Sequence, residues 1–325
     1  MKHLTLQKII NPGFPLIGLL IVLYLGSWVL NYIYIRDFQE YPAVSIRIFQ
    51  PNYLWMIVGI MLITALNILL ITQINSKFSI IRIKTFLPAF TYALLITAWK
   101  ESHFLIYTHL ALTAFLISLM LFWGMYKNKK AATPAYWGSL IISLTGLVNP
   151  IYLFLLPISW FGFVFLKCNS TRIFLAALMG VVTPWIFYLS FQYFMGYEML
   201  IFQTLIAELQ PNFLLAEASL YEQIYISAIV FILIIGLIGI YNNLLNDSIQ
   251  TRQNINFLLL FLIILILLIF IFSRQTHALM PMIAFCIAML LAHPFSLNKI
   301  KFYPLLFIIF CIVNVVYMLI NYIKV

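Results

Sequence analysis

The chain has 325 residues, of which 65% are hydrophobic and only 8% are charged. Charged residues make up about a quarter of an ordinary soluble domain, so this composition excludes one. The net charge of +10 does not indicate nucleic acid as a partner, because the cations are spread thinly between apolar runs. Anionic lipids of an inner leaflet fit such a distribution better.

Eleven apolar runs predict an all-α fold, a polytopic bundle of about 11 transmembrane helices. Several runs are short for a hydrocarbon layer of about 30 Å. Isolated strands are excluded in lipid, and no alternating ten-residue segments indicate a barrel. The first run lacks a small-residue cleavage site before Arg36, so we interpret it as a retained span. The runs lie at about 14–35, 53–73, 86–99, 103–125, 136–148, 151–166, 172–194, 222–241, 255–272, 276–292 and 303–322.

The Asn149-Pro150 dipeptide interrupts a mostly apolar stretch at 136–166, which is either one kinked helix or a tight hairpin. Cytoplasmic loops carry an excess of Lys and Arg, so the distribution of cations decides between the two. A hairpin places 13 of the 18 Lys and Arg on one side and 5 on the other, whereas one helix gives 10 against 8. The distribution favours the hairpin.

This topology predicts a membrane protein with a cytoplasmic N-terminus and a C-terminus on the outer side. Seven of the eight carboxylates then lie in outer loops, and Asp247 alone lies inside. Two outer loops are long, at 36–52 and 195–221. The second alternates apolar with acidic residues, which indicates a helix in the outer interface rather than a solvated loop.

The outer loop after the first span contains the first candidate site, Asp37 and Glu40. A carboxylate at the membrane surface can take a proton from an acceptor hydroxyl or help to bind a divalent cation, and partial burial would raise its pKa toward that of a useful base. On a helix, residues three apart face the same way. An ordinary polar boundary that stops the helix from sliding is the structural alternative.

Two further clusters contain candidate substrate- or phosphate-binding residues. Lys100, Glu101 and His103 stand between two apolar runs with hardly any loop, and a capped interfacial hairpin is their structural alternative. Arg274 and His277 lie at a predicted outer turn, where an arginine opposes the positive-inside bias. A guanidinium matches a phosphate, although snorkelling to headgroups is the alternative.

The remaining polar residues receive no site prediction. We interpret His109 and His293 as structural or interfacial, and the three cysteines as packing residues without metal-type spacing. No metal-ligand set and no glycine-rich phosphate loop is present in the sequence. The sequence identifies no cofactor with certainty. A divalent cation, Mg²⁺ or Mn²⁺, is considered only as a ligand of the carboxylates in the acidic outer loop.

The layout resembles the polyprenyl-phosphate-dependent (GT-C type) membrane glycosyltransferases and a family of multi-pass inner-membrane proteins of Gram-negative bacteria. The resemblance covers roughly residues 10–292 and rests on the acidic outer loop, the short inner connections and the long outer loop after the seventh span. It implies a seven-helix module at 1–221, followed by four spans at 222–325 in one integral membrane domain. It also implies an acidic base at Asp37 or Glu40 and a lipid-phosphate sugar donor. The segments that have the cadence of the superfamily are Leu87-Pro88-Ala89-Phe90, Gly146-Leu147-Val148-Asn149-Pro150, Gly180-Val181-Val182-Thr183-Pro184-Trp185 and Ser273-Arg274-Gln275-Thr276-His277-Ala278-Leu279-Met280-Pro281.

Three functions follow as hypotheses. The first is a glycosyltransferase-like enzyme that acts on a lipid-linked glycan at the outer face, with Asp37 as base, Glu40 as its helper, and Lys100 with Arg274 as phosphate binders. The second is a scaffold or subunit of an envelope-assembly complex, which would have envelope proteins as partners. The third is a lipid or solute transporter, which the scarcity of charges within the spans disfavours.

Overall fold

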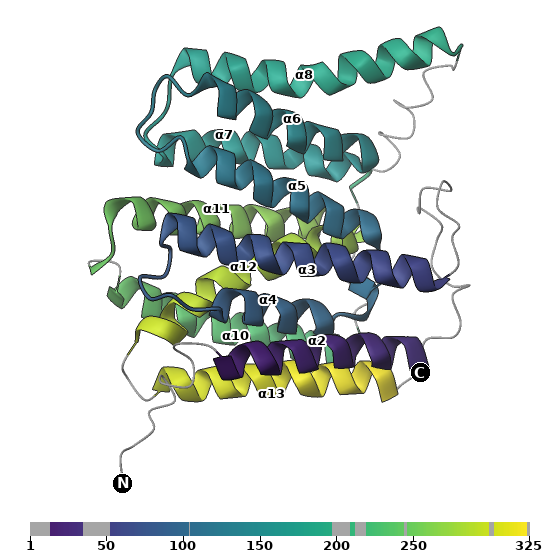
Figure 1. Ribbon diagram of the computed structural model, residues 1–325, viewed down its shortest axis with the longest axis vertical. Helices are drawn as coiled ribbons and strands as arrows, with labels where there is room; N and C mark the ends of the chain where they lie inside the picture. The colour runs from purple at the N-terminus through teal and green to yellow at the C-terminus, as the bar shows by residue number, and fades with distance from the viewer. Residues whose placement is uncertain are drawn as a thin grey trace. The chain divides into compact units, whose positions relative to one another are not determined.

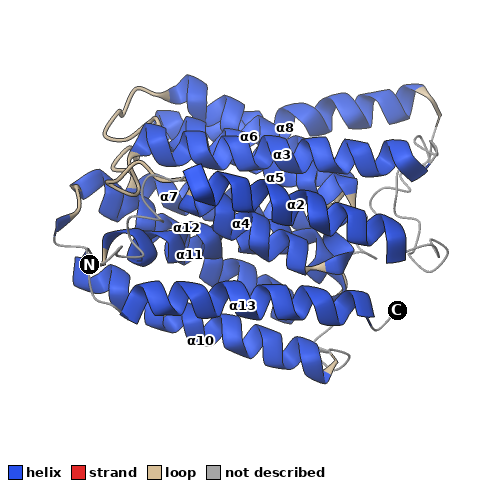
Figure 2. Cartoon of the chain, turned by 60° about the horizontal axis from the view of Figure 1, so that its bottom comes forward, coloured by secondary structure: helices blue, strands red, loops and turns tan. Residues whose placement is uncertain are grey.

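The computed structural model describes residues 14–34, 53–103, 105–196, 209–211, 219–243, 246–298 and 302–323. Within these ranges the chain forms eleven α-helices and three short 3₁₀ helices, and contains no strand (Figure 2). The predicted all-α class is therefore confirmed, and each expected span corresponds to one helix. The expected helix in the 195–221 loop lies almost entirely outside the described residues.

The helices have the following bounds, and the numbering is that of Figure 1. They are α2 (Phe14–Tyr34), α3 (Tyr53–Phe78), α4 (Leu87–Ala98), η2 (Lys100–His103), α5 (Ile106–Trp123), α6 (Ala132–Val148), η3 (Pro150–Phe154), α7 (Leu155–Phe165), α8 (Thr171–Phe194), α10 (Leu220–Asn243), α11 (Ile249–Ile271), η5 (Ser273–Gln275), α12 (Thr276–Leu297) and α13 (Phe302–Ile323).

Seven of the described helices are long and apolar enough to cross a membrane. Their side chains cannot be hidden in one core, since large apolar residues such as Leu175, Phe187 and Phe231 are exposed along them. Lipid is the solvent that accepts such surfaces. The chain is therefore a multi-pass membrane protein, as the composition predicts.

The chain divides into two compact units. Unit 1 comprises Met1–His109, Ala216–Ser248 and Met280–Val325, and unit 2 comprises Leu110–Leu215 and Ile249–Leu279. The predicted division into a module at 1–221 and four spans at 222–325 rests on the family resemblance rather than on contacts between residues, and it stays a prediction.

Unit 1 is built around α4, which packs against α2, α3 and α13 (Figure 1). Every residue of α4 is buried, as expected of a helix that is apolar on all sides and surrounded by others. The Thr91 hydroxyl donates to the carbonyl oxygens of its own turn and lies 3.2 Å from that of Ala288 on α12. With 12 residues, α4 is only about 18 Å long. The turn that follows it therefore begins within the depth of the longer neighbouring helices.

Unit 2 contains the close pair α6 and α8, which lie side by side (Figure 1). A Cβ at Gly180 on α8 would lie 2.3 Å from the backbone oxygen of Tyr136 on α6, so only glycine permits this approach. Two hydrogen bonds add to the packing: Ser143 donates to the carbonyl oxygen of Val181, and the Trp185 indole donates to the Ser143 hydroxyl.

The Asn149-Pro150 interruption is a hairpin, as predicted. Asn149 is extended (φ −145°, ψ 120°) and its side chain accepts from the backbone N–H of Ile151, so α6 ends there. After this turn α7 runs antiparallel to α6. Gly146 lies next to Leu153 and Ser139 next to Trp160, and in each pair the two residues are equally far from the turn in sequence.

The predicted topology places successive turns at alternate ends of the helices, and within each unit the turns that contact each other are ones predicted to lie at the same end. In unit 2, Lys127 N–H donates to Leu166 O, which joins two turns that only the hairpin topology places on one side. At the opposite end, the Asn149 side chain donates to that of Gln275 at 2.8 Å. In unit 1, the Asn321 side chain donates to Ala98 O, which joins two predicted outer ends. The single kinked helix is thereby excluded.

Candidate functional site

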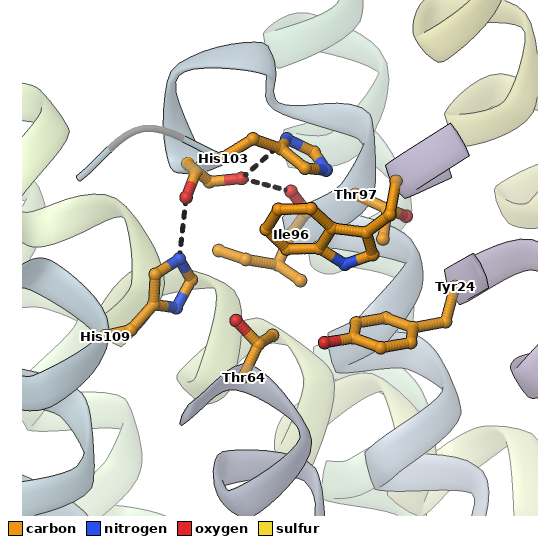
Figure 3. A pocket seen from close by; sticks show the side chains of 8 residues that line it. Tyr24, Thr64, Ile96, Thr97, His103 and His109 are labelled. Atoms are coloured by element: carbon orange, nitrogen blue, oxygen red, sulfur yellow. Dashed lines mark hydrogen bonds between the residues drawn. The ribbon is translucent and has the colours of Figure 1, made fainter. Parts of the chain in front are cut away.

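A small polar pocket lies in unit 1 at the predicted outer turn between α4 and α5 (Figure 3). The side chains around it pack closely, and the space between them does not admit a water molecule. Four helices and η2 contribute to it, so residues distant in sequence meet there. The lining residues are Tyr24, Trp28, Thr64, Ile96, Thr97, Ser102, His103 and His109.

Among the predicted binding residues whose side chains the structure describes, His103 lines this pocket. It is buried, and its ring meets the indole of Trp28 edge-on at a centroid distance of 4.7 Å. Trp28 in turn lies edge-on to Tyr24, whose hydroxyl donates to the carbonyl oxygen of Met61 at 2.6 Å. These contacts join α2, α3 and η2, and the predicted binding role of His103 stays a prediction.

His109 holds the turn in shape from the first turns of α5. Its Nε2 lies 2.7 Å from the carbonyl oxygen of Ser102, and because a carbonyl only accepts, Nε2 carries the proton. The Ser102 hydroxyl lies 2.6 Å from the carbonyl oxygens of both Ile96 and Trp99. Ser102 thereby satisfies one carbonyl in the last turn of α4, that of Ile96, and the carbonyl that follows the helix at Trp99. The interpretation of His109 as structural fits these contacts, although its position in the pocket was not foreseen.

The pocket is set back from the ends of the neighbouring helices. Trp28 precedes the last residue of α2, Tyr34, by about 9 Å of helix. Thr64, on the opposite wall, follows the first residue of α3, Tyr53, by about 16 Å. The turn with Lys100, Glu101 and His103 therefore lies deeper than the ends of α2 and α3, which both lead into the acidic outer loop.

The predicted catalytic residues, Asp37 and Glu40, lie outside the described residues. Asp37 follows the end of α2 by three residues, a distance that an extended chain spans in about 10 Å at most. Lys100 and Glu101 belong to η2, and only their backbone is described. Their predicted roles stay predictions.

Arg274 and His277 belong to unit 2, where both side chains are exposed. Arg274 lies in η5 and His277 in the first turn of α12. Their neighbour Gln275 is bound by Asn149, and the Tyr152 hydroxyl donates to Ala278 O at 3.1 Å, so the turn is fixed from both sides. Exposure leaves Arg274 accessible to an anion or a headgroup.

A charged cluster in unit 1 was missed by the sequence reasoning. The Asp247 carboxylate is fully buried; its Oδ1 lies 2.8 Å from Arg82 Nε and its Oδ2 lies 3.0 Å from His293 Nε2. Breaking such a buried arrangement by removing one partner leaves an uncompensated charge. The signal in the sequence was that Asp247 is the only carboxylate on its predicted side, where Arg82 and His293 also fall.

Other groups of the described residues do not extend the site. Within the described ranges no group of three or more His, Cys, Asp or Glu side chains could hold a metal ion. All three cysteines are free, which agrees with their interpretation as packing residues. Burial raises the pKa of the Cys168 thiol to about 11, so this thiol is unreactive at neutral pH.

No family model, curated protein or solved structure matches this chain.

Proposed function

We propose that the protein is a glycosyltransferase-like enzyme of the bacterial inner membrane that uses a polyprenyl-phosphate-linked sugar at the periplasmic face. The observation that carries this proposal is the Trp28–His103 contact. It joins the helix that leads into the Asp37 loop to the turn that contains Lys100 and Glu101. A carboxylate that could act as base, Asp37, and a cation that could bind a phosphate, Lys100, would then belong to one end of a helical bundle.

The proposed chemistry assigns one task to each component. Asp37 accepts the proton of an acceptor hydroxyl, whose oxygen forms the new bond to the anomeric carbon. The bond between that carbon and the phosphate oxygen breaks, and the electron pair leaves with the lipid phosphate. Lys100 stabilises the charge that develops on this phosphate, because a cation in a site that excludes water acts strongly on it. Arg274 is a second candidate for that task.

The set-back position of the turn supports a lipid-linked donor in particular. A phosphate attached to a polyprenyl chain lies at the boundary between headgroups and hydrocarbon. The turn with Lys100, set back below the ends of α2 and α3, lies at a depth that suits such a phosphate. The proposed orientation, with a cytoplasmic N-terminus, places this end of unit 1 outside.

The test is a sugar-transfer assay on the purified protein with polyprenyl-phosphate sugars, with and without Mg²⁺ or Mn²⁺. Asp37→Ala is the test variant and Glu222→Gln is the matched control, because Glu222 caps the start of α10 through the Ser219 N–H instead. Transfer that is lost in the first variant and kept in the second supports the proposal. Undiminished transfer in Asp37→Ala refutes the role of that base.

A scaffold in an envelope-assembly complex is the second candidate function, and the small volume of the pocket favours it. Ligand sites usually enclose about 300–1,000 Å³, whereas the space between the side chains of this pocket does not admit a water molecule. A scaffold predicts envelope proteins that co-purify in fixed proportion, and it predicts no effect of Asp37→Ala on their recovery. Recovery of such partners without transfer activity would favour this candidate over the enzyme.

A further inference from the structure

The segment at the opposite end of unit 1 from the pocket, residues 77–86, has the composition of a membrane-surface element. It joins α3 to α4 and contains three cations: Lys77, Arg82 and Lys84. All three are exposed, and so are the apolar Ile83 (40%) and Phe86 (44%). Cations that alternate with exposed apolar side chains are typical of a segment at the boundary between headgroups and acyl chains.

Buried polar side chains hold this basic segment (77–86) in one conformation. The Asn75 amide, which is 4% exposed, accepts from Ile81 N–H at 3.1 Å and lies 3.5 Å from the carbonyl oxygen of Thr85. The Thr85 hydroxyl accepts from Leu87 N–H at the start of α4. Ile80 and Ile81 are buried beneath the segment. If the segment only extended its cations to the headgroups, it would not require the hydrogen bonds of Asn75 and Thr85 that fix its backbone.

Asp247 fixes the central cation of the segment. Its carboxylate contacts Arg82 through Nε, which leaves the two terminal amino groups of the guanidinium for another anion. Arg82 remains 41% exposed, whereas Asp247 and His293 are buried beneath it. The Asp247 carboxylate thus holds the Arg82 side chain in place, so this side chain loses less conformational entropy when it binds a ligand.

We propose that the basic segment (77–86) is a binding site for an anionic phospholipid, with the headgroup phosphate on Arg82 and Lys84 and the acyl chains against Ile83 and Phe86. The charges decide the class of lipid: among the residues that the structure describes, the ion pairs are those of Asp247 with Arg82 and His293, and none includes Lys77 or Lys84. The two lysines therefore favour an anionic headgroup. This site is independent of the proposed enzymatic function and of which side of the membrane the segment faces.

The experiment measures phospholipid binding to the delipidated protein by native mass spectrometry, in titrations with phosphatidylglycerol and with phosphatidylcholine. The test variant is Lys77→Gln/Lys84→Gln, which removes two exposed cations of the segment and keeps the contact between Arg82 and Asp247. The matched control is Lys129→Gln/Lys130→Gln, which removes two exposed cations from another turn on the same predicted side. Thermal unfolding of each variant establishes that it is folded.

We expect tighter binding of phosphatidylglycerol than of phosphatidylcholine by the wild-type chain. Each basic residue near an anionic surface strengthens binding about fivefold, so the test variant should lose about 25-fold for phosphatidylglycerol and little for phosphatidylcholine. The control should keep the wild-type preference. Equal binding of the two lipids by the wild type, or an equal loss in test variant and control, would overturn the proposal.

Discussion

The indole of Trp28 lies edge-on to the imidazole of His103, with ring centroids 4.7 Å apart and an interplanar angle of 67°. This contact joins the first helix to the turn between α4 and α5 across more than 70 positions of sequence. Edge-to-face pairs of rings are attractive beyond the area that they bury. The pair therefore fixes the depth at which the polar turn lies.

Replacement of His103 by alanine should lower the stability of the protein by about 2 kcal/mol, because it removes a buried ring that packs against Trp28. His277→Ala is the matched control, since His277 is exposed and its loss should leave stability unchanged. Thermal unfolding in detergent measures both. An equal effect of the two variants would contradict the packing role of His103.

Asp247→Asn should destabilise the protein by about 3 kcal/mol, since Arg82 and His293 then lose a buried carboxylate partner. Glu222→Gln serves as the comparison, because glutamine preserves the capping contact with Ser219 at the start of α10. The measurement is again thermal unfolding. A midpoint for Asp247→Asn as high as that of the wild type would show that the cluster contributes nothing.

Gly180→Ala should separate α6 from α8, because the added methyl group would meet the backbone of Tyr136 rather than a side chain that can move. We expect a loss of about 1–3 kcal/mol. At Gly26 nothing lies within 4 Å of an added Cβ, so Gly26→Ala should be neutral or slightly stabilising. Comparable stability of the two variants would argue against the close α6–α8 packing.

Cys168 should resist alkylation in the folded protein. A thiol with a pKa raised to about 11 is almost entirely neutral at pH 8, where about one molecule in a thousand carries the thiolate. In a Cys286→Ser/Cys311→Ser chain, maleimide labelling should be slow at pH 8 and become rapid after denaturation. Fast labelling of the folded chain would contradict the burial of Cys168.

Single cysteines in a chain without its native ones should report the two sides of the membrane. Arg274→Cys should react with an impermeant maleimide added to intact spheroplasts, whereas Lys129→Cys should react only after permeabilisation. Both positions are exposed and belong to unit 2, so the pair is matched for access. The opposite pattern would invert the proposed orientation and place the Trp28–His103 turn in the cytoplasm.

The helices were predictable because lipid imposes one strong requirement: every backbone polar group within the bilayer must be satisfied inside its own helix. Hydropathy alone therefore placed each span, and the count of cations decided that Asn149 ends a helix. Helix pairing was not predictable, since apolar helices in lipid associate through shape. The role of Gly180 depends on its close approach to the backbone of Tyr136, and the sequence around Gly180 does not indicate this approach.

The polar turn was predictable only as a candidate. Charged residues without a loop around them marked residues 100–103, and the structure places His103 in a pocket. The contribution of Tyr24 and Thr64 was not foreseen, because each is a single polar side chain within an apolar helix. The Asp247 cluster was missed for a similar reason: its members come from three separate segments and are joined only by the fold.

The most direct test of the account is photo-crosslinking of a diazirine-bearing polyprenyl phosphate to the purified protein, with the crosslinked peptides mapped by mass spectrometry. A diazirine-bearing phosphatidylcholine is the control lipid. If the polar turn binds the lipid phosphate of a donor, crosslinks specific to the polyprenyl phosphate will concentrate in α2 and in residues 96–109. The same distribution for both lipids, for example along the exposed apolar face of α8, would contradict it.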